Sequence, residues 1–344
     1  PGAHQYEAGL SYGTQRYVGG NADALAAVSG GSRNVGEVFA YDNWTLSRQV
    51  EVTYGGKYAR YDYLTERGLL SPSAAVTLTP VAGSNFRIQA AVSRREVAPG
   101  ADEFLPPSTG LWLPPERTFS PVTPGAGFAH ERVDRVEGGV EGEWIGDVVI
   151  GVRAFREQVG NQIVTLFGVE LPGTAAANIG HYYVGSGGDF SATGFTFGVR
   201  RDISSRLRAS VDYTQAEADW TGPAPDGLRL LAAAASALRT GSERLHDVTA
   251  TIESEVPSTA TRVVVLYKVN TAFASEGAER QAATRFAVQV NQALPFLNFS
   301  SAQWEMLVAV RNLFNDAFGQ GSVYDELLVV NPPKRFVGGL TVRF

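Results

Sequence analysis

The segments of this chain that resemble β-strands are joined by connections of alternating length, and this alternation limits the fold more than any other feature. Apolar and polar residues alternate with a period of two over about 14 segments, which is the spacing of a β-strand with one apolar face. The predicted strands cover 4–17, 35–43, 47–63, 72–80, 85–96, 131–144, 147–160, 190–201, 205–219, 244–256, 260–273, 282–293, 301–313 and 334–344. Consecutive strands of this kind form an antiparallel meander.

Tight and long connections alternate along the chain. The tight ones read DNWT, VAGS, IGD, DISS, PSTA and LPFLNFS. The long ones occupy 97–130, 161–189 and 220–243, with shorter members at 18–34, 64–71, 274–281 and 314–333. Short turns at one end of the strands and long loops at the other are typical of an outer-membrane barrel, with the turns periplasmic and the loops extracellular. We therefore predict an all-β fold, a transmembrane antiparallel up-and-down β-barrel, over a soluble sandwich, whose strands would alternate in the same way.

The same alternation assigns residues to the two faces of the wall. The predicted lipid-facing residues include Ile252, Val288 and Val308, and the predicted inward ones include Thr251, Gln289 and Ala309. Inward charges are expected to form a solvated wall at Glu137, Glu141, Glu253, Glu255, Arg206 and Arg208. Aromatic residues are expected at the two membrane interfaces. Those at the loop end are Tyr58, Tyr61 and Tyr63, and those at the turn end are Trp44, Trp144, Phe296, Phe299 and Phe344.

Composition excludes several classes of protein. A net charge of -6 argues against a general nucleic-acid binder. The absence of cysteine excludes disulfides and thiol chemistry. There is no run of about 18 apolar residues, so no helical membrane span is predicted. The histidines His4, His130, His181 and His246 share no ligand spacing, so neither a metal site nor a cofactor is predicted.

Two local motifs bear on catalysis and on the loops. GLSYG at 9–13 matches the nucleophile elbow of hydrolases, but strand alternation runs straight through it and no helix pattern follows, so Ser11 is read as an inward wall residue and no enzyme is predicted. AAAASALR at 232–239 is rich in helix formers inside a long loop. It is either a short helix covering the mouth of the barrel or a disordered loop tip.

The last segment, KRFVGGLTVRF at 334–344, keeps the strand period to its final residue. A barrel has no free edge only when its last strand pairs with its first. We therefore expect an ordered terminal strand, with Phe344 in the periplasmic aromatic girdle.

Several stretches resemble the TonB-dependent outer-membrane receptors. RNLFNDAF at 311–318 is similar to the family's Asn-Leu-Phe-Asn/Asp segment near the end of the penultimate strand, and NPPKRFVGGLTVRF at 331–344 is similar to its last loop and strand. DNWTLSRQVEVTYGGKYARYDY at 42–63 resembles the family's turn and rising strand, with Lys57 where arginine is commoner. LLSPSAAVTLTP at 69–80 and VSRREVAPGADEF at 92–104 resemble the strands that follow.

The resemblance implies an active transporter of the Gram-negative outer membrane. Family members have a 22-stranded barrel filled by an N-terminal plug that contacts TonB. Neither plug nor TonB box appears in these residues, so 1–344 is expected to be one barrel domain, the C-terminal portion of such a barrel. The implied partners are membrane lipid, TonB through the missing plug, the barrel assembly machinery, which would recognise Phe344, and a small ligand: a siderophore, cobalamin, a metal chelate or a saccharide. The alternatives are a complete passive porin-like channel of about 14 strands and a soluble or surface-bound β-protein used for adhesion.

Aromatic residues in the predicted loops are candidates for binding that ligand, because aromatic side chains often line ligand sites. They are Trp112, Phe119, Tyr182, Tyr183 and Trp220. The same rings could instead pack the loops against one another.

Overall fold

The computed structural model describes residues 3–16, 32–81, 84–101, 118–144, 147–171, 181–276, 278, 281–294, 303–311 and 327–343. One 14-stranded sheet dominates it, in the order β1-β2-β3-β4-β5-β7-β8-β11-β12-β13-β14-β15-β16-β18. Its strands are β1 (His4–Arg16), β2 (Ser32–Ser47), β3 (Val50–Tyr61), β4 (Gly68–Leu78), β5 (Arg87–Val97), β7 (Glu131–Glu143), β8 (Val148–Gly160), β11 (Phe190–Ser204), β12 (Leu207–Trp220), β13 (Gly241–Val256), β14 (Thr261–Phe273), β15 (Gln281–Ala293), β16 (Gln303–Arg311) and β18 (Arg335–Arg343). Each predicted strand has its counterpart, so the up-and-down meander is confirmed.

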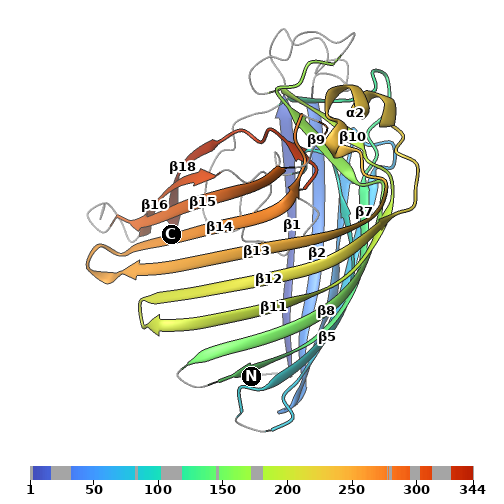
Figure 1. The fold of residues 1–344 in the computed structure, drawn as a ribbon. Coiled ribbons are helices and arrows are strands. Elements are labelled where there is room, and N and C mark those ends of the chain that lie inside the picture. The colour runs from blue at the N-terminus through green and yellow to red at the C-terminus, as the bar shows by residue number, and fades with distance from the viewer. Residues whose placement is uncertain are drawn as a thin grey trace.

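The sheet curves into part of a barrel wall (Figure 1). Neighbouring strands are antiparallel throughout, and they twist so that β1 and β2 run at a steep angle to β14 and β15. Over the described residues no pairing joins β1 to β18, so each of these strands has one hydrogen-bonded neighbour in the sheet.

The first tight turn lies later than the sequence predicts. DNWT is part of β2, where Trp44 pairs with Val52, and the chain reverses at Arg48 and Gln49. The Ser47 hydroxyl accepts the Gln49 N–H at 3.2 Å. Trp44 continues the outward apolar pattern, and this pairing outweighs the turn preference of Asp and Asn.

The two faces of the wall follow the predicted alternation. One outward row runs Ala209–Ile252–Val265–Val288–Val310–Phe336 across six neighbouring strands. Large apolar side chains on this face are exposed, for example Val211 at 47% and Phe336 at 75%. A soluble protein would bury such a continuous surface, whereas a barrel presents it to lipid.

The predicted girdles need one correction. Tyr58 faces outward and is 42% exposed, as an interfacial residue would be. Tyr61 is 3% exposed and packs edge to face with Tyr63 within the loop core. The reason is parity: Tyr58 and Tyr61 are an odd number of residues apart on β3, so they lie on opposite faces. Phe296, Phe299 and Phe344 lie outside the described residues.

The long loops carry elements that the alternation of the wall strands did not predict. A second, four-stranded sheet has the order β17-β9-β10-β6. Its strands are β6 (Thr118–Pro121), β9 (Ile163–Phe167), β10 (His181–Ser186) and β17 (Val329–Val330). β9, β10 and helix α2 (Gly227–Ala233) lie together at one end of the wall (Figure 1). We call β6, β9, β10, β17 and α2 together the loop cap.

The predicted helix at 232–239 is displaced. The α-helix spans Gly227–Ala233, and a 3-10 turn follows at Ala235–Ala237. Ala234 between them is not helical, and Leu230, Ala234 and Ala237 are all buried in one apolar cluster. Tertiary packing of these residues outweighs the helix preference of the alanine run. A second 3-10 turn, Pro257–Thr259, forms the tight connection between β13 and β14.

No helix in the described segments is long and apolar enough to cross a membrane.

Candidate ligand-binding site

The loop cap is assembled from loops that are far apart in the sequence. β6 precedes β7, β9 and β10 lie between β8 and β11, α2 lies between β12 and β13, and β17 lies between β16 and β18. β17 runs parallel to β9, with Val329 opposite Thr165, and β6 runs parallel to β10. Loops from opposite halves of the wall therefore meet in one small sheet over its end.

An aromatic cluster joins the cap to the inner face of the wall. Phe119 and Tyr182 stack with ring centroids 5.3 Å apart, and Phe128 and Phe167 pack beside them. The same cluster contains wall residues Val35, Ala59, Tyr61 and Leu69, all buried. Burying each such ring contributes about 1.5 to 3 kcal/mol, so the cluster holds the cap in place.

Arg33 of β2 lies at the centre of this cluster with no exposed surface. Its guanidinium carbon lies 3.6 Å from the centroid of the Phe119 ring, and its Nη2 donates to the Phe119 carbonyl at 2.8 Å. A buried charge is tolerated when hydrogen bonds and ring faces replace water. The close packing also requires Gly100, which has a φ of 72°, because a Cβ there would overlap the Phe119 ring.

Polar contacts fasten the other segments of the cap. The carboxylate of Asp226, just before α2, accepts from the Thr123 hydroxyl at 2.6 Å and from the Ser186 N–H at 2.8 Å. Glu131 of β7 accepts the Ile163 N–H at 2.7 Å, and Arg285 of β15 donates to the Val329 carbonyl at 3.0 Å. Each of the last two contacts ties a wall strand to a cap strand.

The structure separates the aromatic residues proposed for ligand binding. Phe119 and Tyr182 belong to the cluster around Arg33 and are 0% and 1% exposed. Tyr183, 1% exposed, packs in another cluster with Val122 and Leu230. Trp220 is half-buried and stacks on Phe190 at 5.1 Å. Here the described rings pack the loops together, and their contact with a ligand stays a prediction. Trp112 lies outside the described residues.

Several residues of the cap were missed at the sequence level. Glu131 was predicted as an ordinary wall residue, and Arg33 and Asp226 fell in the predicted connections 18–34 and 220–243. A usable signal was present for two cap strands, since QIVTLFGVEL at 162–171 and HYYV at 181–184 are apolar or aromatic runs inside a loop.

Below the cap, the inner wall carries paired charges. Arg135 lies 3.0 Å from both Glu137 and Glu157, and Arg87 lies 2.9 Å from Glu141. Near the turn end, Arg208 pairs with Asp202 at 2.6 Å and Arg262 with Glu253 at 2.9 Å. A polar ligand passing along this wall could pair with one of these charged side chains in place of its present partner. In the described parts of the chain, no group of three or more acidic or histidine side chains could hold a metal ion.

Sequence comparison decides the family. Residues 2–275 match the model of the TonB dependent receptor-like β-barrel. The chain belongs to this family. Its relatives are outer-membrane transport receptors, which agrees with the outward apolar face of the wall. No curated protein sequence matches the chain.

Solved structures similar to this chain include a siderophore receptor, a ferric enterobactin receptor and an iron transporter. The siderophore receptor PirA from Pseudomonas aeruginosa is 14% identical, with 91% of this chain and 49% of that chain covered and a TM-score of 0.39. A mutant ferric enterobactin receptor (PfeA) from the same organism is 16% identical, with 91% and 45% covered and a TM-score of 0.38. The FrpB iron transporter from Neisseria meningitidis is 12% identical, with 98% and 52% covered and a TM-score of 0.44. The chain thus spans about half the length of these proteins.

Proposed function

We propose that residues 1–344 are a single barrel domain, the C-terminal part of the wall and loop cap of a receptor that imports a small molecule with energy from TonB. The ligand is a siderophore, cobalamin, another metal chelate or a saccharide. TonB acts through a plug domain contributed by a segment outside these residues. The receptor lies in the outer membrane of a Gram-negative bacterium.

The loop cap is the observation that supports this proposal most directly. A passive pore needs a mouth that stays open, whereas here loops from both halves of the wall interlock in one small sheet and share an aromatic core with the inner wall. A ligand held by such loops is admitted only when the cap and the lumen rearrange, which requires a source of energy. An energised receptor therefore explains the cap better than a porin does.

Uptake measurements in whole cells test the proposal. Cells with and without the receptor gene are given 55Fe-loaded enterobactin, 57Co-cobalamin or radiolabelled maltodextrin, each with and without a protonophore. We expect receptor-dependent accumulation of one probe, abolished by the protonophore and by loss of TonB. Accumulation that continues without the proton gradient, together with steady conductance of the purified receptor in planar bilayers, would establish the passive porin instead.

A further inference from the structure

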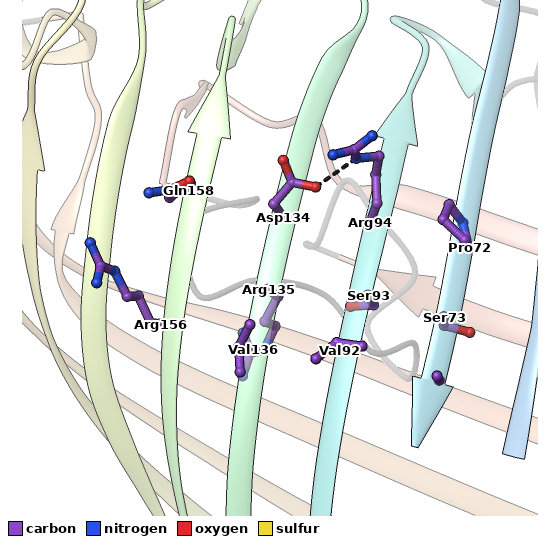
Figure 2. Close-up of a pocket in the computed structure, with 11 residues that line it drawn as sticks. Pro72, Ser73, Val92, Ser93, Arg94, Asp134, Arg135, Val136, Arg156 and Gln158 are labelled. Atoms are coloured by element: carbon purple, nitrogen blue, oxygen red, sulfur yellow. Dashed lines mark hydrogen bonds and ion pairs between the residues drawn. The ribbon is translucent and has the colours of Figure 1, made fainter. Parts of the chain in front are cut away.

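A pocket of about 720 Å³ opens on the side of the wall at β4, β5, β7 and β8 (Figure 2). The side chains that line it alternate along their strands with the inward ones and belong to the outward face. They are Pro72, Ala74, Val92, Arg94, Asp134, Val136, Arg156 and Gln158. Val92 and Val136 are 51% and 57% exposed, so the pocket faces the region that lipid occupies around the barrel.

The pocket forms where two strands part. The β4–β5 ladder runs from Leu78 and Ile88 to Ser73 and Ser93 and then ends beside Pro72, which has no N–H to donate. Beyond it, Glu96 bridges the strands: its N–H donates to the Ser71 hydroxyl at 3.0 Å, and its carboxylate accepts the Leu70 N–H at 2.7 Å. These side-chain contacts take the place of the backbone ladder, and the floor of the pocket beside Ala74, Val92 and Val136 is apolar.

The loop end of the pocket is basic. Asp134 accepts from Arg94 Nε at 2.6 Å and from Arg132 Nε at 2.8 Å, which holds the two guanidinium groups side by side. Their side chains remain 42% and 50% exposed. Arg156 is exposed and has neither a hydrogen bond nor an ion pair to any described residue. Arg94, Arg132 and Arg156 are positively charged, and Asp134 and Glu96 are negatively charged. This end of the pocket therefore has a net charge of +1 (three positive against two negative groups).

Arg156 differs from the other outward arginine in its row. The row runs Val92–Val136–Arg156–Thr193–Glu217–Arg244. Arg244 lies across from Glu217, but Arg156 lies between Val136 and Thr193. An arginine at the boundary of the apolar band needs an anion from outside the protein, and phosphate oxygens suit the planar guanidinium group.

We propose that this pocket binds a phosphate-bearing membrane lipid, with its phosphate at Arg156 and an acyl chain along Val92, Val136 and Ala74. The apolar floor of the pocket matches the acyl chain of such a lipid, and the basic end matches its phosphate. A free anion would use only the basic end, and an uncharged lipid would use only the floor. The proposal goes beyond ligand import and concerns the outside of the wall, so it does not depend on which ligand is carried.

Native mass spectrometry of the receptor purified from outer membranes in detergent tests the proposal. The probes are 1-palmitoyl-2-oleoyl phosphatidic acid, the diacylglycerol with the same chains, and inorganic phosphate. Arg156→Gln removes the charge, and Arg244→Gln is its control on the same row outside the pocket. Ala74→Phe fills the floor, and Ala209→Phe is its control elsewhere on the outward face. Heat-modifiable mobility confirms that each variant is folded.

We expect phosphatidic acid to bind the native receptor in preference to diacylglycerol. Arg156→Gln and Ala74→Phe should each weaken that binding about tenfold, which is the effect of losing one charge-assisted hydrogen bond or the chain contact. The two control variants should bind as the native receptor does. Equal binding of diacylglycerol, equal losses in a variant and its control, or displacement of the lipid by inorganic phosphate at similar concentration would each overturn the proposal.

Discussion

An arginine placed at Val211 should separate a membrane wall from a soluble sheet. Val211 lies outward between Val199 of β11 and Ala250 of β13, in the middle of the apolar residues of β12, and is 47% exposed. An arginine on the lipid-facing side near the bilayer centre costs about 2 to 4 kcal/mol. That corresponds to a loss of about 30-fold to several hundred-fold in the ratio of folded to unfolded receptor.

The matched control is Thr249→Arg on the neighbouring strand. Thr249 faces inward across from Asp212, whose carboxylate can pair with the introduced guanidinium group, so the cost should stay below about 1 kcal/mol. Gln289, also inward, would be a poor control because it is 5% exposed, whereas Thr249 is half-buried and loses a hydrogen bond to Asp247 at 3.1 Å. Urea titration of the receptor folding into phosphatidylcholine vesicles measures both variants. Equal losses for Val211→Arg and Thr249→Arg would refute the assignment of the outward face to lipid.

Four further predictions concern the cap, the topology and the terminal residue. Asp226→Asn should weaken two hydrogen bonds of the cap and raise its rate of cleavage in limited proteolysis, while the wall stays intact. Arg33→Met should lower the free energy of unfolding by about 2 to 5 kcal/mol, because it leaves the Phe119 carbonyl buried without its donor; urea unfolding measures this. In intact cells an impermeant maleimide should label Leu228→Cys but not Ser204→Cys, and the reverse pattern would invert the topology. Deleting Phe344 should reduce the heat-modifiable receptor in the outer membrane without changing its synthesis.

The wall was predictable because its physics is local. Alternation along each strand assigns Val211 and Ile252 to one face without knowledge of any neighbour, and the connection lengths give the antiparallel order. The exception at Trp44 arose because the turn was read from Asp and Asn alone. Pairing of Trp44 with Val52 extends the strand past them.

The cap was not predictable in the same way. β17 contains only Val329 and Val330, which no periodicity can identify, and it becomes a strand because it meets β9 from a distant loop. Arg33 is the second residue of β2 and faces inward like many wall arginines. Its burial depends on Phe119, which lies on a loop strand far along the chain. Contacts of this kind are set by how the loops meet, and a single sequence does not record that.

The composition of the cap also limits how it can open. Separating the rings around Arg33 would expose Tyr61, Phe119, Phe128, Phe167 and Tyr182, at a cost of about 7 to 15 kcal/mol. Nanomolar binding supplies about 12 kcal/mol, so dismantling this cluster would consume most or all of the binding free energy of a ligand. The α2 segment is held more weakly, since Leu230 is its buried residue while Leu228 and Leu231 are 87% and 56% exposed. A ligand is therefore expected to enter by displacing α2 and its Asp226 contacts, with the aromatic cluster staying on the wall.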